Sequence, residues 1–298
     1  GVERGGIGRV IEQTEEGRRG DDESGVKTSA DPNIEVKDKH GKAEKTLVMV
    51  VSEKGSSMPF AKWTCYDTGL QSACIARWPG KIKPGSVSNA LIEYIDVLPT
   101  FVAAAGATPD PVLQGKSLLP VLFGQSKHHK DYVFGEMTTL GIINGSPHFG
   151  IRSVRSAKYK YIVNFTPETP FTNACTKSPQ FRSWVRKAEQ GDKDAADKVR
   201  RYQRRPAEEL YAITKDVYEW NNLANDPKYA SVKAELKKQL TSWMSAQGDL
   251  GQATELAALE HQKRAQKKAD KAKKKKQQQE QRRQEKQRQK TLGQTKGK

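Results

Sequence analysis

Residues 45–85 read Lys45-Thr-Leu-Val-Met-Val-Val-Ser-Glu-Lys-Gly-Ser-Ser-Met-Pro-Phe-Ala-Lys-Trp-Thr-Cys-Tyr-Asp-Thr-Gly-Leu-Gln-Ser-Ala-Cys-Ile-Ala-Arg-Trp-Pro-Gly-Lys-Ile-Lys-Pro-Gly85. The apolar run 47–51 is short enough for a fully buried strand, and it ends in the polar turn 52–55. In open α/β sheets ligands bind at the carboxyl ends of strands, so Glu53 would emerge where a metal or an anion is held. Lys62 follows nine residues later, and we expect it beside the same cleft.

Strands alternate with helices in the residues that follow. Residues 73–78 predict a second buried strand, residues 90–95 a strand or strand-like link, and residues 132–134 a further strand. Asp96 is expected to cap a helix that Gly106 closes and that buries the side formed by Leu98, Phe101 and Val102, and a short helix is expected over 117–122. The alternation predicts an α/β domain with a mostly parallel sheet.

The pattern changes after residue 148. Residues 150–155 and 159–163 alternate around a polar turn and predict a β-hairpin. A helix is expected over 192–202, a short strand over 209–211, and an amphipathic helix over 229–243 that ends at Gly248. We therefore expect four parts: a weakly ordered segment 1–45 with a short helical piece near 8–16, an α/β part 46–148, an α+β subdomain 149–250, and a tail 251–298.

The positive charge of the chain is concentrated in the tail. The net charge is +17, and residues 251–298 contain 16 basic and 5 acidic residues, so +11 of it lies there. The segment 256–290 favours helix by propensity but has almost no apolar residue to bury. The tail is either solvated or in contact with a polyanion. Because no aromatic residues are interleaved in it, specific nucleic-acid binding is not favoured.

No run of about 18 apolar residues occurs, so no membrane span is expected. No signal peptide is visible, and because the sequence starts at Gly1 we expect a processed or truncated amino terminus. The three cysteines, Cys65, Cys74 and Cys175, have no CxxC spacing. Buried free thiols are expected, with a Cys65–Cys74 bridge as the alternative.

Short motifs follow one another in a fixed order: Glu53-Lys54-Gly55, Lys62, Tyr66-Asp67-Thr68-Gly69, Trp78-Pro79-Gly80, Asp96-Val-Leu-Pro99-Thr100, Ala105-Gly106, Gly115-Lys-Ser117-Leu118, Ile151-Arg152-Ser153-Val154, and Arg205-Pro206-Ala-Glu-Glu209-Leu-Tyr211 with Asp216 and Asn222-Leu-Ala224. Over about 200 residues this set resembles the sulfatase family, from the second half of its catalytic domain to its carboxyl-terminal subdomain. Residues 149–171 look closest to the heparan N-sulfatases, the N-sulfoglucosamine sulfohydrolase branch. The resemblance implies an alkaline-phosphatase-like α/β fold.

The resemblance also implies the chemistry of a site. It assigns Glu53 to a Ca²⁺ ion, since calcium takes hard carboxylate oxygens, and Lys62 to the sulfate or leaving-group oxygen as a cation. The implied reaction is hydrolysis of sulfate esters or N-sulfate groups, on a sulfated carbohydrate or another sulfate ester. His148 and Arg152 are candidates for substrate binding, with a structural role as the alternative. Export to the periplasm or beyond is the expectation from the family.

Two departures from the family pattern limit this expectation. Lys54 stands where the family places an amide or imidazole, and an ammonium has only donors, so it cannot ligate calcium. The formylglycine motif Cys/Ser-x-Pro-x-Arg does not occur, so these residues offer no nucleophile. We therefore expect an amino-terminally incomplete and inactive fragment of a sulfatase. The alternative is a non-catalytic sulfatase-like scaffold that binds acidic glycans through its basic tail.

Overall fold

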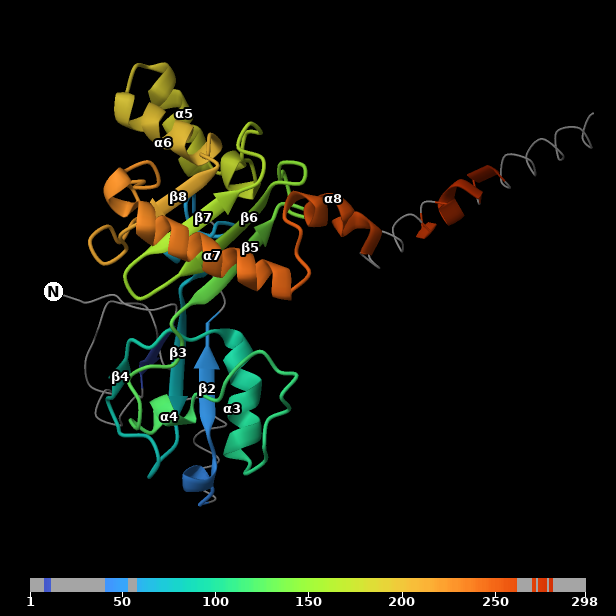
Figure 1. Ribbon diagram of the computed structural model, residues 1–298. Coiled ribbons are helices and arrows are strands. Elements are labelled where there is room, and N and C mark those ends of the chain that lie inside the picture. The colour runs from blue at the N-terminus through green and yellow to red at the C-terminus, as the bar shows by residue number, and fades with distance from the viewer. Residues whose placement is uncertain are drawn as a thin grey trace, which may run out of the picture. The chain divides into compact units, whose positions relative to one another are not determined.

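The computed structural model describes residues 8–11, 41–52, 58–261, 270–271, 273–277 and 279–280, without the side chains of 8–11 and 259–261. The chain divides into two compact units, Gly1–Gly251 and Gln252–Lys298 (Figure 1). After residue 11 the described residues resume at 41 and form a 3₁₀ turn, η2 (Ala43–Lys45).

The first sheet has the strand order β2-β3-β1-β4. Its members are β1 (Gly8–Ile11), β2 (Val48–Val51), β3 (Ser72–Arg77) and β4 (Val87–Ser88). The strands expected over 47–51 and 73–78 are confirmed, but the full burial expected of 47–51 is wrong, because no residue of β2 is fully buried and Val50 and Val51 are 51% and 42% exposed. The short helical piece expected near 8–16 is wrong over 8–11, because the apolar pair there is used in β1, which runs parallel to β3 and antiparallel to β4.

The first half of the chain also contains short helices. One lies between β2 and β3, namely α2 (Asp67–Leu70), and three lie between the first sheet and the second, namely η3 (Tyr94–Asp96), α3 (Val97–Ala104) and α4 (Leu119–Leu122). The helix after Asp96 is confirmed, and Gly106 follows it with a φ of +80°. Its expected buried side is wrong, because α3 buries Pro99 and Thr100 while Leu98 and Phe101 are exposed and Val102 is only partly buried. The strand expected over 90–95 is also wrong, since these residues form an irregular link that ends in η3.

The second sheet is antiparallel, with the order β5-β6-β7-β8. Its strands are β5 (Val133–Thr138), β6 (Gly150–Arg155), β7 (Lys160–Asn164) and β8 (Glu208–Tyr211). The expected hairpin is confirmed as β6 and β7. The sequence placed a boundary at residue 148, yet β5 pairs with β6 along its whole length, so this strand belongs with the elements that follow the boundary.

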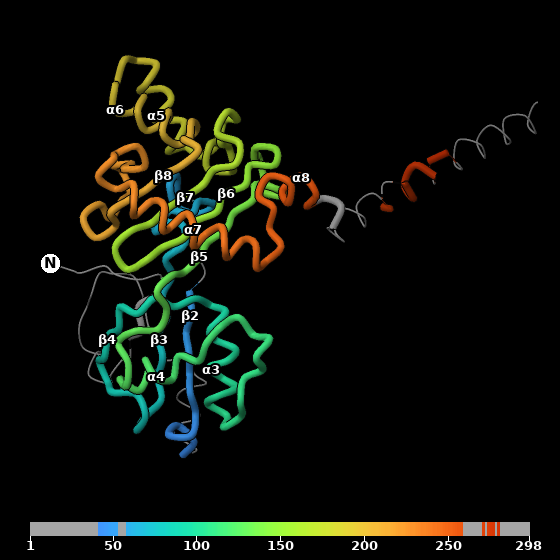
Figure 2. Tube along the Cα trace, in the orientation of Figure 1, coloured from blue at the N-terminus to red at the C-terminus, as the bar shows by residue number. Residues whose placement is uncertain are grey.

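Helices and turns of the second half surround this sheet: η4 (Ala174–Lys177), α5 (Pro179–Glu189), α6 (Lys193–Gln203), η5 (Pro227–Tyr229) and α7 (Ala230–Ala246). The helices expected over 192–202 and 229–243 are confirmed as α6 and α7, whereas α5 was not expected. Figure 2 traces α7 along the second sheet and α5 and α6 as a separate pair.

The α/β class is confirmed, but a mostly parallel sheet is not what the described strands form. Among them only β1 and β3 pair in parallel. Alternation of strands and helices predicts parallel pairing when each helix connects neighbouring strands of one sheet. Here α3 and α4 lie between β4 and β5, which belong to different sheets, so the alternation does not describe a single crossover.

The second sheet separates two buried clusters. One face packs Ile151, Ile162 and Tyr211 against Cys65 and Tyr66 of the loop before α2. The other face packs Val154, Tyr161 and Leu210 against α7. Because side chains alternate between the faces of a strand, each position of β6 can be assigned to one side.

The second unit begins with α8 (Gln252–His261) and continues in helical residues between 270 and 280, whose side chains are exposed. No helix among the described residues is both long and apolar enough to cross a lipid bilayer.

Candidate functional site

Lys62 lies in the loop 58–66, between β2 and α2, and two non-glycine residues of this loop have left-handed backbone angles. The φ of Phe60 is +63° and that of Trp63 is +65°. Such angles are unfavourable for bulky side chains and persist only where the surrounding structure imposes them, most often at functional sites. The Lys62 ammonium lies 5.7 Å from the centre of the Trp63 ring. The loop therefore holds Lys62 partly buried on a strained backbone.

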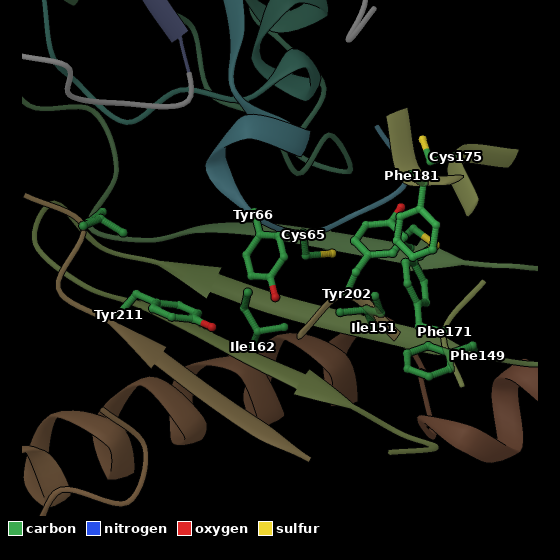
Figure 3. Close-up of a cluster of buried hydrophobic side chains, with 12 residues drawn as sticks. Cys65, Tyr66, Phe149, Ile151, Ile162, Phe171, Cys175, Phe181, Tyr202 and Tyr211 are labelled. Atoms are coloured by element: carbon green, nitrogen blue, oxygen red, sulfur yellow. The ribbon is translucent and has the colours of Figure 1, made fainter. Parts of the chain in front are cut away.

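Aromatic packing fixes this loop against α6 and the segment that follows β8. The Phe60 ring lies 5.1 Å from the Tyr202 ring and 5.3 Å from the Trp220 ring, measured between centroids. Cys65 and Tyr66 point into the cluster that Figure 3 shows over the strands. The backbone around Lys62 is thus bounded by rings from the second half of the chain.

Tyr66 anchors the loop through a buried carboxylate. Its hydroxyl donates to Oε2 of Glu209 at 2.8 Å, and the same carboxylate accepts from the Tyr211 hydroxyl at 2.6 Å and from Nδ2 of Asn164 at 2.7 Å. The guanidinium of Arg205 lies 4.9 Å from the Tyr66 ring centre. Burial raises the pKa of Tyr66, so its hydroxyl remains a donor.

Asp67 provides a second anchor. Its carboxylate pairs with the buried Lys160 ammonium and accepts from Nε of Arg155 at 3.2 Å, and its N–H donates to Oε2 of Glu219 at 2.6 Å. Lys160 also lies 3.1 Å from Oε1 of Glu219. Burial alone would raise the pKa of Asp67, but Lys160 and Arg155 lower it. Burial raises the pKa of Glu219 to about 7.

Gly69, in the same motif, has no room for a side chain. A Cβ on Gly69 would lie 2.4 Å from the carbonyl oxygen of Thr64, closer than real side-chain atoms come. Tyr66 and Asp67 therefore dock α2 and the preceding loop on the second sheet, and Gly69 allows α2 to pack closely against Thr64 of that loop. They make no free surface for a ligand, and their functional effect is to hold the segment that contains Lys62.

Asp96 also has a structural role. Its carboxylate is fully buried, and it lies 2.7 Å from the Lys130 ammonium and 3.2 Å from Nε2 of His129. It accepts the N–H groups of Lys116 at 2.9 Å and Glu93 at 2.8 Å. These contacts join the start of α3 to the start of β5.

Arg152 and Lys62 are not brought to one site by the second sheet. Ile151, Ser153 and Arg155 of β6 face the loop 58–66, so Arg152 faces α7 with Val154. The Arg152 side chain is buried, and its Nε donates to Oδ2 of Asp249 at 2.6 Å. This contact fits the structural alternative for Arg152, and its substrate-binding role stays a prediction.

His148 stands in the loop between β5 and β6 with a φ of +49° and a partly buried side chain. Its substrate-binding role stays a prediction. Glu53 and Lys54 lie outside the described residues. Among the residues with described side chains, no three His, Cys, Asp or Glu groups gather as a metal site. With one assigned carboxylate and a neighbouring ammonium, this chain alone does not offer a fitting donor set for calcium.

Sequence reasoning named Glu209 in a motif but missed it as the partner of Tyr66. It also missed the other side chains that contact the motif residues, namely Arg155, Lys160, Glu219, His129 and Lys130. Tyr66 and Glu209 are 143 positions apart, and Asp67 and Glu219 are 152 apart. Local patterns do not define such pairs. One signal in the sequence could have indicated these partners: Arg155, Lys160 and Glu209 are charged residues that occur in or beside predicted strands.

Comparisons with known proteins agree with the motif order. Residues 55–172 match the family model described as N-sulphoglucosamine sulphohydrolase, C-terminal. The chain is 38% identical over 207 residues to an ulvan-active sulfatase of Formosa agariphila, covering 70% of this chain and 39% of that protein. It is 27% identical over 220 residues to human N-sulphoglucosamine sulphohydrolase, covering 66% of this chain and 41% of that protein.

Among solved structures, BT4656 in complex with its substrate D-glucosamine-2-N,6-O-disulfate matches with a TM-score of 0.54 and 19% identity, covering 74% of this chain and 38% of that one. This likeness shows the fold. The chain spans about two fifths of the length of these relatives. Motif order, family model and fold agree, and the chain belongs to the sulfatase family, matching the C-terminal part of its members.

Proposed function

We propose that this chain forms part of a sulfuric ester hydrolase that acts on sulfated carbohydrates, with Lys62 as a cation for the sulfate or leaving-group oxygen. One observation carries the proposal: a strained loop with two anchors in the second sheet presents Lys62. A sulfate ester is an anion whose leaving-group oxygen gains negative charge as its S–O bond breaks, and a fixed positive side chain stabilises that charge in the transition state. Relatives named for ulvan and for N-sulphoglucosamine support a carbohydrate substrate.

We also propose that these 298 residues do not hydrolyse sulfate esters by themselves. They contain no Cys/Ser-x-Pro-x-Arg motif from which the family's formylglycine is made. Without a nucleophile no covalent step is available. Activity therefore requires a polypeptide that supplies it, and Lys62 acts on the substrate that this nucleophile attacks.

The test joins this chain to the portion of the Formosa agariphila ulvan-active sulfatase that precedes its matched region. Lys62→Ala should lower kcat/KM for a sulfated carbohydrate by roughly 100-fold or more, the size seen when one charge-stabilising donor is removed. Lys81→Ala, at an exposed lysine of the same half, is the control and should leave kcat/KM unchanged. Equal rates for the Lys62→Ala protein and its parent would refute the role of Lys62.

For calcium, we propose that Glu53 supplies one ligand and that Lys54 weakens the site. Replacing a cation beside the ion with an amide removes repulsion and adds an oxygen donor. Lys54→Asn in the joined protein should therefore lower the Kd for Ca²⁺ by about tenfold or more, measured by isothermal titration calorimetry. An unchanged Kd would mean that the turn 52–55 does not ligate the ion.

A second candidate function is binding of acidic glycans by the tail. The favouring observation is that Lys273, Lys274, Lys275 and Lys276 lie in a helical segment with exposed side chains. Loss of residues 262–298 should lower the salt concentration at which the chain elutes from heparin. Elution at the same salt concentration would remove this candidate. The cut after His261 keeps Asp249, which pairs with Arg152.

A further inference from the structure

The helices α5 and α6 and the residues beside them contain the net positive charge of the first 250 residues. Residues 177–205 hold 10 basic and 4 acidic side chains, so their net charge is +6. The whole chain carries +17 and residues 251–298 carry +11, so residues 1–250 also carry +6. Outside 177–205 the charges of this part therefore cancel, and one short segment differs from the rest.

One side of this pair of helices is anchored in the protein. Phe181 of α5 and Tyr202 of α6 are buried, and their ring centroids lie 5.3 Å apart. Trp184 and Val199 pack against the same buried cluster. Figure 2 shows the two helices side by side. Since their apolar side chains point into the cluster, their charged side chains remain for the outer side.

The outer side of the pair is exposed and basic. On α5, Arg182 and Arg186 are four residues apart, so they share a face of the helix. On α6 and at its end, Lys193, Arg200 and Arg204 are separated by seven and four residues, which also places them on one face. We call the exposed cations of the pair the α5–α6 basic surface, made by Arg182, Arg186, Lys187, Lys193, Arg200 and Arg204.

Carboxylates neutralise this surface only in part. Among the residues that the structure describes, Arg182 and Arg186 have no carboxylate partner, and Asp197 is shared between Arg200 at 2.5 Å and Arg201 at 2.6 Å. Like charges one turn apart destabilise a helix. Helix stability therefore does not account for Arg182 and Arg186, whereas binding of an anion does.

We propose that the α5–α6 basic surface binds a sulfated polysaccharide chain at sulfate groups other than the one that is hydrolysed. A guanidinium donates paired hydrogen bonds to an oxyanion with several oxygens, and a surface of one sign raises the local concentration of a polymer of the opposite sign. The occupant rests on the proposed function and on relatives named for ulvan and N-sulphoglucosamine. The surface itself is tested by binding and not by hydrolysis.

A nucleic acid is the less suitable polyanion for this surface. Single-stranded nucleic acids are bound by cations together with aromatic rings on which the bases stack. The aromatic side chains of α5 and α6 are Phe181, Trp184 and Tyr202, and all three belong to the buried cluster on the other side of the pair. The outer side offers cations without a stacking ring.

The experiment uses the full chain and a heparin decasaccharide as the sulfated probe. The double variant Arg182→Gln/Arg186→Gln should raise the Kd by roughly tenfold at low salt and should reduce the slope of log affinity against log salt by about 1 for each lost contact. Lys158→Gln/Lys238→Gln removes two exposed charges elsewhere in the first unit. It is the matched control and should bind like the parent.

Because the tail is also basic, a second readout is local. Phenylglyoxal modifies exposed arginines, and mass spectrometry of peptides reports each site separately. Saturating heparin should protect Arg182 and Arg186 several-fold, and the same decasaccharide without its sulfate groups should not protect them. Circular dichroism should show that both double variants are folded like the parent.

Unchanged modification of Arg182 and Arg186 in saturating heparin would overturn the proposal, as would equal Kd values for the arginine variant and the lysine control. Equal protection by a single-stranded oligonucleotide of the same charge would overturn it in favour of a general polyanion surface. Heparin binding that depends on these arginines, in a chain whose joined form hydrolyses no sulfate ester, would support this surface and count against the proposed function alone.

Discussion

Asp96 carries a charge without solvent contact, and donors from separate parts of the chain surround it. The Lys130 ammonium lies 2.7 Å and the His129 ring 3.2 Å from its carboxylate, and the N–H groups of Lys116 and Glu93 donate to it. Burial alone would raise the pKa of Asp96, but these groups lower it to about 2. A carboxylate with a depressed pKa stabilises the folded state at pH values where it is ionised.

This shift predicts acid sensitivity. The stabilisation is fully present above the unfolded pKa of about 4, is lost as pH falls toward 2, and amounts to about 2 kcal/mol. Asp96→Asn should lower the free energy of unfolding by about 3 kcal/mol at pH 6 and should reduce its decline between pH 4 and 2. Urea unfolding at several pH values measures both. Asp131→Asn, at an exposed acid nearby, is the control.

The same acid dependence in Asp96→Asn and in the parent would contradict the assigned ion pair. Other carboxylates with lowered pKa values, such as Glu208, contribute to the slope in both proteins. The difference between the two slopes therefore isolates Asp96.

The cysteines allow a direct check of burial. Cys65, Cys74 and Cys175 are free and buried, so the alternative of a Cys65–Cys74 bridge is not what the structure contains. Burial raises the pKa of Cys65 and Cys74 to about 11, so little reactive thiolate exists at pH 8. Ellman's reagent should react with none of the thiols in the native protein at that pH and with three in denaturant. Two fewer equivalents in denaturant would indicate a disulfide.

At the level of elements, Tyr66 and Tyr211 test how the loop 58–66 is held. Both hydroxyls donate to Glu209, at 2.8 Å and 2.6 Å, but only Tyr66 belongs to the loop segment that contains Lys62. Tyr66→Phe and Tyr211→Phe should each cost about 1.5–3 kcal/mol of stability, the range for hydrogen bonds to a charged group. In the joined protein, Tyr66→Phe should also lower kcat beyond the effect of Tyr211→Phe. Equal kcat values would mean that the Tyr66 anchor does not position Lys62.

The elements that sequence predicted well are those with a complete local pattern. The hairpin β6–β7 and the helix α7 each show their periodicity within one segment. The helix α5 was missed although Ser178 and Pro179 form a recognisable start, with the Ser178 hydroxyl accepting from the N–H of Phe181. For β2 and α3 the apolar pattern was read correctly, but burial depends on what covers it, and that is not a local property.

The same limit applies to the candidate site. Lys62 and Glu53 were assigned because the motif order marks them, and their roles stay predictions that local chemistry alone does not give. The partners of Tyr66 and Asp67 were not found, because tertiary contacts across more than 140 positions create them. The sequence therefore identifies the motif residues, and the structure identifies the residues that they contact.

For the whole molecule, the tail and the folded unit should be separable. The buried clusters lie between Leu47 and Met244, all in the first unit. A chain that ends at His261 should therefore unfold within about 2 °C of the full chain by calorimetry, since no buried cluster is removed. A chain that ends at Gln247 also loses Asp249, whose carboxylate lies 2.6 Å from the buried Arg152 guanidinium. It should lose about 3 kcal/mol. Equal melting temperatures for the two truncated chains would contradict the role of Asp249, and a large loss in the chain ending at His261 would show that the tail stabilises the first unit.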